Sequence, residues 1–307
     1  MIQVESLTKR YNGKTAVDSI SFQANEQEIL VLLGTSGCGK TTTLKMINRL
    51  IEPDSGTILI DGKSIREQQA EQLRMGIGFV MQHSGLFPHY TIRQNIAVVP
   101  KLLKWSPKQT EQRTQELLEK LHLSEDVLNR YPQELSGGQQ QRVGIARALI
   151  ANTPVLLMDE PFGALDTITK ADIHAEFKSL QELKNKTVVL VTHDVQEAFE
   201  LGHRIALMDN GKIIQIGTRE EIIYRPKNSF VSEFFAENRL LLEYKLTSIS
   251  ALMPYLHESG NFLNQSNLSE SDSTWHALQK LSTDKTHALD YERLSQAFGE
   301  YRKSQIR

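Results

Sequence analysis

The chain has 307 residues, 39% of them hydrophobic, which is enough to bury the core of one large domain with a smaller appendage. Its 35 Lys and Arg residues nearly balance 37 Asp and Glu residues, and the net charge of -2 gives no reason to expect a nucleic acid or an acidic lipid as partner. The single cysteine, Cys38, excludes an intramolecular disulfide and fits a reducing compartment.

Two further features concern the membrane. The first residues lack a basic start followed by an apolar run, so no signal peptide is expected. The longest uninterrupted apolar stretches, such as residues 29–33, are far shorter than the roughly 20 residues that span a bilayer. We therefore expect any membrane function to depend on a partner chain.

Short strands are predicted in the first third of the chain, at residues 2–4, 19–22, 28–33 and 57–60. Turn-forming sequences lie at residues 12–13, 54–56 and 61–62. The segment 28–33 is continuously apolar after its first residue, which is typical of a strand buried on both faces of a sheet.

A glycine-rich loop follows this strand and precedes a helical run that extends to Leu50. It matches the pattern G-x-x-x-x-G-K-[ST], whose backbone N–H groups converge on a β-phosphate. Lys40 would add positive charge at the β- and γ-phosphates, and Thr41 would offer its hydroxyl to Mg²⁺. Cys38 occupies a variable position of the loop, and we interpret it as a space-filling residue rather than a redox group. The candidate nucleotide-binding residues are Gly34, Thr35, Ser36, Gly37, Cys38, Gly39, Lys40, Thr41 and Thr42.

Gln82 follows a predicted strand at residues 77–81 and precedes an irregular segment, residues 83–88. Alone, a glutamine here would be an ordinary surface residue. Beside a phosphate loop, its amide can both donate and accept, which suits it to contact Mg²⁺ and the attacking water.

The pattern becomes helical from residue 91 to residue 123, which predicts a helical subdomain at about residues 83–150. Near its end lies the pentapeptide Leu135-Ser136-Gly137-Gly138-Gln139. Ser136, Gly137 and Gly138 open a helix and present backbone N–H groups and a hydroxyl to phosphate oxygens. Because the first loop already holds the phosphates of its own nucleotide, this second loop must serve the nucleotide of another molecule.

An apolar strand at residues 155–158 ends in two carboxylates, Asp159 and Glu160. Adjacent acids at a buried strand end are costly without a cation, and Mg²⁺ would relieve that cost. We expect Asp159 to orient the metal and Glu160 to polarise the water that attacks the γ-phosphate. His193 follows another apolar strand, residues 187–191, and we expect it to contact the γ-phosphate. The other eight histidines show no metal-binding spacing.

The predicted fold is α/β: a P-loop NTPase with a mostly parallel core sheet, an antiparallel β subdomain, a helical subdomain and a small C-terminal appendage. Further strands are expected at residues 204–208 and 213–216, and a helix at residues 168–183. The main domain is predicted at residues 1–238 and the appendage at residues 239–307. Two short amphipathic helices are expected in the appendage. Their apolar residues are Trp275, Leu278 and Leu281 in the first and Tyr291, Leu294 and Phe298 in the second.

Residues 1 to about 240 resemble the nucleotide-binding subunit of an ABC transporter, since the pentapeptide is the signature of that family. The resemblance implies ATP and Mg²⁺ as cofactors, with Thr41, Gln82 and Asp159 near the metal. It places Tyr11 against adenine and makes Gln82 the Q-loop glutamine, residues 164–166 with Asp166 the D-loop, and His193 the switch histidine. It also implies a head-to-tail homodimer in which Ser136, Gly137, Gly138 and Gln139 cap the ATP held by Lys40 of the other subunit.

Three segments, residues 46–53, 85–89 and 95–105, look like those of glycine betaine, carnitine and choline importer ATPases. This similarity implies integral-membrane permease subunits, an extracytoplasmic substrate-binding protein and a peripheral position on the cytoplasmic face of the membrane. Several such ATPases carry paired CBS modules, for which the roughly 70 residues after Asn238 are too few. A different regulatory appendage and a dimer contact both remain open, and we favour dimer packing.

Other functions fit the sequence to different degrees. An importer of another polar solute, such as an amino acid, fits the same motifs. A soluble ABC ATPase acting on DNA or ribosomes would need long coiled-coil insertions or tandem cassettes, and neither lies between Lys40 and Asp159. A non-catalytic regulatory ABC protein is disfavoured because the residues that hydrolysis needs are intact.

Overall fold

The computed structural model describes residues 1–82, 84–163, 167–256, 268–283 and 288–305. It divides into two compact units, Met1–Ile216 and Gly217–Arg307. The boundary expected from the sequence, near Asn238, lies inside the second unit. Residues 217–238 belong to this unit because helix α9 (Arg219–Tyr224) packs on α11 (Arg239–Leu246), and the Tyr224 hydroxyl lies 3.4 Å from Oγ1 of Thr247.

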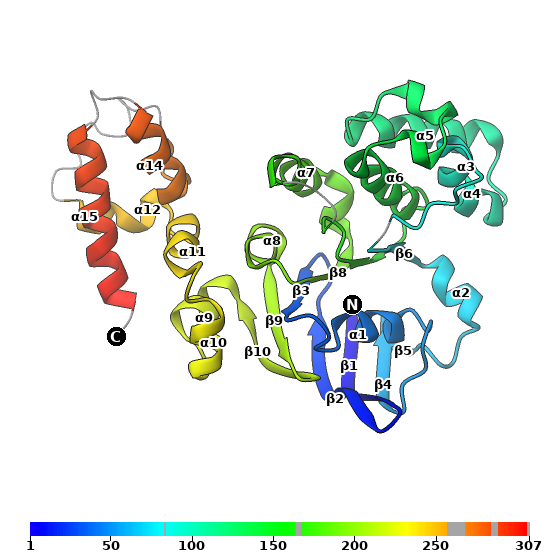
Figure 1. Ribbon diagram of the computed structural model, residues 1–307, viewed down its shortest axis with the longest axis horizontal. Coiled ribbons are helices and arrows are strands. Elements are labelled where there is room, and N and C mark those ends of the chain that lie inside the picture. The colour runs from blue at the N-terminus through cyan, green and yellow to red at the C-terminus, as the bar shows by residue number, and fades with distance from the viewer. Residues whose placement is uncertain (83, 164–166, 257–267, 284–287, 306–307) are drawn as a thin grey trace. The chain divides into compact units, whose positions relative to one another are not determined.

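The first unit contains a six-stranded sheet with the strand order β10-β9-β3-β8-β7-β6 (Figure 1). Neighbouring strands from β9 to β6 are parallel, which confirms the predicted α/β architecture with a mostly parallel core sheet. Every residue of β3 and β8 is buried, in keeping with their continuous apolar sequences. The strands are β3 (Ile29–Gly34), β6 (Ile77–Val80), β7 (Val155–Asp159), β8 (Thr187–Thr192), β9 (Arg204–Asp209) and β10 (Lys212–Thr218).

A second sheet is antiparallel where its pairing is described and has the order β2-β1-β4-β5. Its first two strands are much longer than the sequence predicted. Register shifts after Val4 and Leu7, together with a positive φ of 48° at Ser6, break the alternation of apolar residues and conceal the strand pattern. The strands are β1 (Ile2–Tyr11), β2 (Lys14–Ala24), β4 (Ser55–Ile60) and β5 (Lys63–Ser64).

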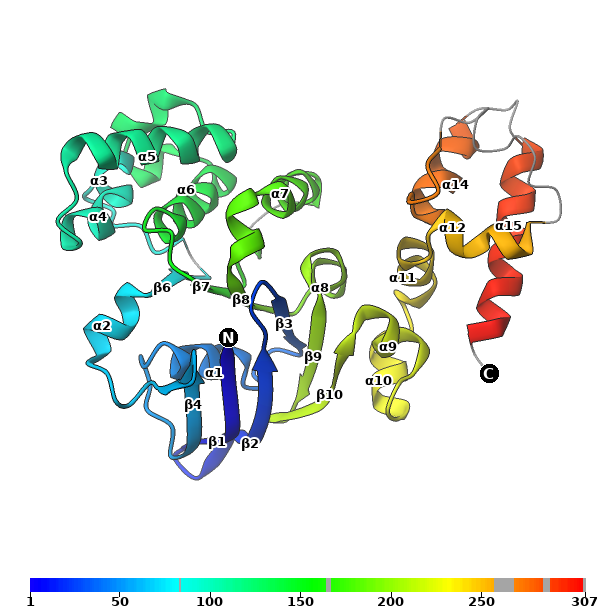
Figure 2. The same cartoon turned by 180° about the vertical axis from the view of Figure 1, so that it is seen from behind.

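Four helices of the first unit form one group. Figure 2 shows α3 to α6 gathered beside the β6 edge of the core sheet, where α3 and α5 pack on α6 and α6 packs on β6. The predicted helical stretch 91–123 is therefore several short helices. This group is α3 (Ile92–Ile96), α4 (Val98–Leu102), α5 (Pro107–Lys120) and α6 (Gly137–Leu149); the others are α1 (Lys40–Ile47), α2 (Ala70–Met75), α7 (Thr167–Ser179) and α8 (Val195–Leu201).

The second unit is helical and has its own apolar core, which includes Leu252, Leu281, Leu294 and Phe298. Both helices expected in the tail are present, as α14 (Thr274–Thr283) and α15 (Ala288–Gln305), although the 18 residues of α15 make it longer than expected. The others are α9, α10 (Ser229–Phe234), α11 and α12 (Ile249–Leu252). Over the whole described chain, no helix combines the length and apolar character that crossing a membrane requires.

Candidate functional site

The parallel sheet brings several predicted site residues to one edge. Strands β3, β6, β7 and β8 run in the same direction, and the residues after their carboxyl ends are the glycine-rich loop, Gln82, Glu160 and His193. Loops at this edge of a parallel sheet are the usual place of ligand binding in such folds.

The loop between β3 and α1 has a backbone that only glycine can adopt at Gly39. Its φ is 105°, and a Cβ atom there would lie 2.4 Å from the carbonyl oxygen of Ala16. The buried Lys40 side chain turns back over the loop, where Nζ donates hydrogen bonds of 2.8 Å to the carbonyl oxygens of Gly34 and Thr35. The loop thus combines backbone that carries no side chain at Gly39 with the ammonium group of Lys40. This combination suits the binding of phosphate oxygens.

The remaining loop residues divide by exposure. Thr35, Ser36 and Gly37 are exposed, whereas Thr41 and Thr42 are half-buried in the first turn of α1. Cys38 is buried, with Sγ 3.8 Å from Nζ of Lys40. Burial raises the pKa of the Cys38 thiol, although nearby Lys40 opposes the shift. A protonated, buried thiol is a weak nucleophile, which agrees with its interpretation as a space-filling residue.

Asp159 and Thr41 form a pair of oxygen donors at the end of β7. The Thr41 hydroxyl donates a hydrogen bond of 2.7 Å to Oδ1 of Asp159. Burial raises the pKa of Asp159, and the bond from Thr41 partly opposes this. Within the described residues no group of three or more His, Cys, Asp and Glu side chains could hold a metal. Mg²⁺ commonly binds one or two carboxylates together with substrate phosphates, so this hydroxyl and carboxylate fit that ion.

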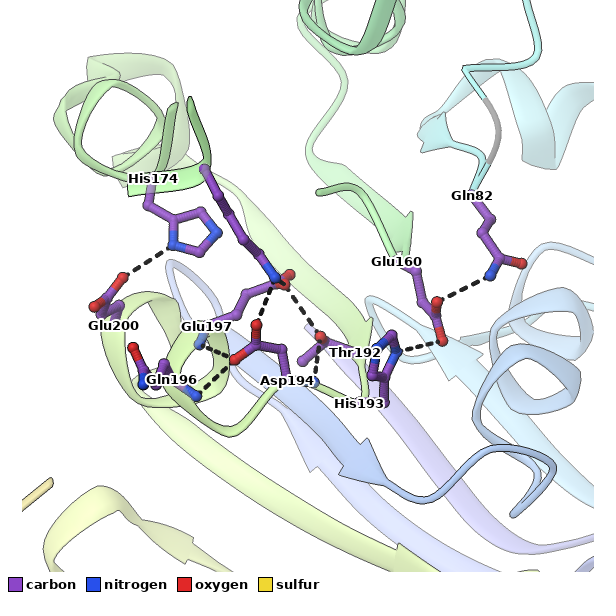
Figure 3. Close-up of polar contacts among 10 residues, drawn as sticks. Gln82, Glu160, His174, Thr192, His193, Asp194, Gln196, Glu197 and Glu200 are labelled. Carbon is purple, nitrogen blue, oxygen red and sulfur yellow. Dashed lines mark hydrogen bonds and ion pairs between the residues drawn. The ribbon is translucent and has the colours of Figure 1, made fainter. Parts of the chain in front are cut away.

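Glu160 lies at the centre of the three predicted catalytic residues (Figure 3). Its Oε2 accepts a hydrogen bond of 2.9 Å from Nε2 of Gln82, and its Oε1 lies 3.2 Å from Nδ1 of His193. The Glu160 backbone has a positive φ of 43°, and its N–H donates to the carbonyl oxygen of Val191. The structure therefore brings together residues that follow three different strands around one carboxylate.

Other predicted site residues either have no described hydrogen bond or ion pair with this cluster or lie outside the described residues. Tyr11 ends β1 and is 43% exposed, with Nζ of Lys9 5.5 Å from the centre of its ring. Ser136 and Gln139 cap α6 reciprocally: Ser136 Oγ accepts from the Gln139 N–H, and Gln139 Oε1 accepts from the Ser136 N–H. Among the described residues, no hydrogen bond or ion pair joins this helix start to Lys40. Residues 164–166, with Asp166, and His83 lie outside the described residues.

The structure adds a network that the sequence did not predict, around the residues that flank His193. Asp194 caps α8, because its Oδ1 accepts from the N–H groups of Gln196 and Glu197. The other oxygen of Asp194 accepts a bond of 2.5 Å from Nζ of Lys170 on α7. An Asp before a helix with a Glu three positions later is a helix-start signal, so Asp194 could have been found in the sequence.

The charges of this network are coupled. Burial raises the pKa of Glu197, whose side chain is 1% exposed and lies 3.4 Å from Nζ of Lys170. For Asp194, burial acts in the same direction but is outweighed by the bonds from Lys170 and the helix N–H groups, and its pKa is lowered. The pKa of Lys170 is raised because these carboxylates outweigh its own desolvation.

Comparison with known proteins connects this geometry to a family. Residues 17–163 match the ABC transporter family. The chain is 53% identical over 242 residues to the glycine betaine/carnitine/choline transport ATP-binding protein of Bacillus subtilis (strain 168), covering 78% of this chain and 64% of the relative. It is 45% identical over 256 residues to the glycine betaine uptake system ATP-binding protein of Escherichia coli (strain K12), covering 83% and 82%. The chain spans less than two thirds of the length of the first curated relatives that it matches.

A solved structure gives the same result. It is the dimeric, post-hydrolysis state of an ATP-binding cassette bound to ADP and Pi, with a TM-score of 0.65, 35% identity, and coverage of 71% of this chain and 98% of that one. The match covers nearly the full length of that cassette and most of the length of the Escherichia coli relative. From these matches and the strand-edge site, the chain belongs to the ABC transporter family.

Proposed function

We propose that this chain is the ATP-hydrolysing subunit that powers import of an osmoprotectant quaternary amine, of the glycine betaine, carnitine or choline type, through a separate membrane permease. The observation that carries hydrolysis is the carboxylate of Glu160, held between Gln82 and His193 beside the phosphate loop. Such a carboxylate can take a proton from the attacking water, while the neighbouring amide and imidazole orient the water and the γ-phosphate.

The loop supplies the binding step. Its N–H groups and Lys40 would hold the β- and γ-phosphates of ATP, while Thr41 and Asp159, with Gln82 nearby, would hold Mg²⁺. When bound, Mg²⁺ would neutralise charge on the phosphate oxygens. Tyr11, 43% exposed at the end of β1, would stack on the adenine ring. These residues bind and orient the nucleotide, and Glu160 acts on the water.

The start of α6 supports a homodimer. Ser136 and Gly137 are exposed there, and their contacts do not join them to this chain's own phosphate loop in the part that the structure describes. A helix start favours phosphate through its N–H groups and its dipole. Ser136 to Gln139 would therefore cap the nucleotide of a second copy.

A groove beside Gln82 suits a permease helix. It has a volume of about 270 Å³, and its apolar lining includes Met75, Phe79, Met81, Phe87, Val98 and Val99. Met81 and Phe87 are 47% and 48% exposed, which is unusual for large apolar side chains. Arg147 donates hydrogen bonds to the carbonyl oxygens of Ser84 and Gly85 and so fixes one wall of the groove. A helix that moves in this groove would displace the segment that begins at Gln82.

The substrate class rests on similarity to quaternary-amine importer ATPases and not on residues of this chain that would contact a solute. An importer of another polar solute, such as an amino acid, is the alternative. In either case the subunit would lie at the cytoplasmic face of the membrane, and a binding protein outside would deliver the solute to the permease. Cation-π contacts from clustered aromatic residues would identify that binding protein as one for quaternary amines.

The test is ATP hydrolysis by the complex reconstituted with its permease and binding protein in liposomes. Stimulation by glycine betaine, carnitine or choline is expected. Stimulation only by an amino acid would reject the substrate class and keep the ATPase, whereas the absence of ATP hydrolysis under every condition would reject the function itself. Met81→Ser in the groove should lower solute-stimulated hydrolysis while leaving the ATP affinity of the isolated subunit unchanged.

A further inference from the structure

We propose that Lys170 is a positioning residue for His193, acting from a neighbouring helix on the two residues that flank this histidine. The inference rests on the proposed function, because His193 matters for rate only if this site hydrolyses ATP. Lys170 lies on α7 and, among the described residues, has no polar contact with Glu160 or the phosphate loop; its ammonium group instead joins α7 to the loop between β8 and α8.

His193 has little holding its own side chain. The imidazole is 58% exposed, and within the described part of the chain its polar contact is the one with Glu160 at 3.2 Å. Its position in space therefore depends on the backbone on either side. A side chain with such freedom needs fixed chain neighbours if it is to meet a γ-phosphate at a set distance.

Both chain neighbours of His193 belong to one hydrogen-bonded network. Thr192 Oγ1 accepts a bond of 3.0 Å from the Asp194 N–H and donates one of 3.1 Å to Oε2 of Glu197. Figure 3 shows Thr192, Asp194 and Glu197 converging beside His193. Hydrogen bonds of these three side chains thus connect the two residues beside His193 to each other and to the first turn of α8.

Lys170 supplies the positive charge of this network. Its Nζ lies 2.5 Å from Oδ2 of Asp194 and 3.4 Å from Oε2 of Glu197, and its own side chain is 18% exposed. Without it, Asp194 and the buried Glu197 would face each other across the start of α8 and would lose the ion pairs that the described residues give them. Like charges that lose their counter-ion in a partly buried site relax by moving apart or by admitting water. Either response would shift the residues next to His193.

The experiment compares Lys170→Met with Lys170→Arg in the full chain. Lys170→Met should lower the kcat for ATP hydrolysis about 10- to 100-fold while KM stays within about twofold, because misplacement of a reacting group by ~1 Å costs up to about 10²-fold. Lys170→Arg keeps the charge and should recover most of the rate. Lys178→Met is the matched control, since Lys178 is an exposed lysine on the same helix, and it should hydrolyse ATP at the parental rate.

A double-mutant cycle separates positioning from general damage to the fold. If Lys170 acts through His193, Lys170→Met should cost nothing further in a His193→Ala background. Backbone hydrogen exchange at residues 192–197 should also be faster in Lys170→Met than in Lys178→Met, with or without ATP. Full additivity of the two substitutions, or parental exchange at residues 192–197, would overturn the inference.

The proposed function fails in a different way. If the parent chain hydrolyses ATP and His193→Ala is impaired, the function stands whatever Lys170→Met does. If the parent and all variants lack hydrolysis in the complete complex, the function is rejected, and the exchange rates at residues 192–197 still decide whether Lys170 holds this loop.

Discussion

The side-chain amide of Gln82 donates a hydrogen bond of 2.9 Å to Oε2 of Glu160, although 78 positions separate the two residues in the chain. The second carboxylate oxygen of Glu160 lies 3.2 Å from Nδ1 of His193. Each oxygen is thus held by a group from a different strand end. Both carboxylate oxygens thus have a protein partner, which favours one orientation of the group that we expect to act as a general base.

Glu160→Gln should bind ATP with nearly parental affinity and hydrolyse it at a few per cent of the parental rate or less. The amide has the shape of the carboxylate but cannot accept the proton of the attacking water, and loss of a general base usually costs about 10²- to 10⁴-fold. Single-turnover hydrolysis and equilibrium ATP binding give the two quantities. Glu119→Gln, an exposed residue of α5, is the control. Near-parental turnover would contradict the role of Glu160.

Asp159→Asn should make the nucleotide-free protein more stable. Asp159 is 5% exposed, and burial raises its pKa although the bond from Thr41 and the charge of Lys45 oppose the shift, so folding destabilises its charged form. Asparagine removes this cost and can still accept the bond from Thr41. We expect the unfolding temperature in EDTA to rise by about 1 to 2 °C, the shift that ~1 kcal/mol gives at about 2.1 cal/mol/K of unfolding entropy per residue in a chain of 307 residues.

The same variant should lose the extra stabilisation that Mg²⁺ adds in the presence of a non-hydrolysable ATP analogue. Thermal unfolding with EDTA and with Mg²⁺ measures both effects in one series. If Asp159→Asn unfolds in EDTA at a lower temperature than the parent, contacts within the protein already offset the cost of burying the Asp159 carboxylate, which would contradict the prediction.

Much of the site could be predicted because it follows the ends of apolar strands. Strands such as β3 and β8 are buried throughout and read as continuous apolar runs, and parallel strands place the residues after them at one edge. The positions of the glycine-rich loop, Glu160 and His193 at this edge can therefore be predicted from the sequence alone. Their mutual contacts cannot, since a spacing in sequence does not give the distance between Gln82 and Glu160.

The rest depends on packing between elements. Lys170 and Asp194 lie 24 positions apart, and only the packing of α7 on α8 brings their charges together. The sequence underestimates the lengths of β1 and β2 because bulges interrupt the alternation that identifies a strand. In the tail, α11 and α12 are not predicted because their sequences are short and show no sustained apolar period.

Asp194→Asn should destabilise the protein by about 1 kcal/mol at neutral pH, the usual size of a single hydrogen bond, and this loss should disappear in acid. The folded pKa of Asp194 lies below its ordinary value of 3.8, since the bonds from Lys170 and the α8 N–H groups outweigh the effect of burial. A depressed carboxyl pKa adds stability that is fully present above pH 3.8 and is lost as the pH falls through the folded pKa. Asparagine retains the helix cap, so the difference reports the charge.

Unfolding temperatures of the parent and of Asp194→Asn between pH 3 and pH 7 would measure this difference. The difference in unfolding temperature between the two proteins should be constant near neutral pH and should become smaller below pH 3.8. A gap that stays the same at the acid end would mean that the ion pair with Lys170 does not contribute to stability.

Ser136→Arg should leave ATP binding largely intact and abolish cooperative hydrolysis. Ser136 is exposed at the start of α6, where arginine would place a bulky cation in front of the N–H groups that we expect to meet a partner's phosphates. We expect ATP binding to the chain's own loop at Lys40 not to use these groups. The measurements are ATP affinity, the Hill coefficient and the dependence of the rate on protein concentration.

Ser106→Arg is the matched control, because Ser106 caps α5 in the same way, with Oγ accepting from the Gln109 N–H. Equal loss of binding and hydrolysis in Ser136→Arg would show that α6 serves the nucleotide of its own chain.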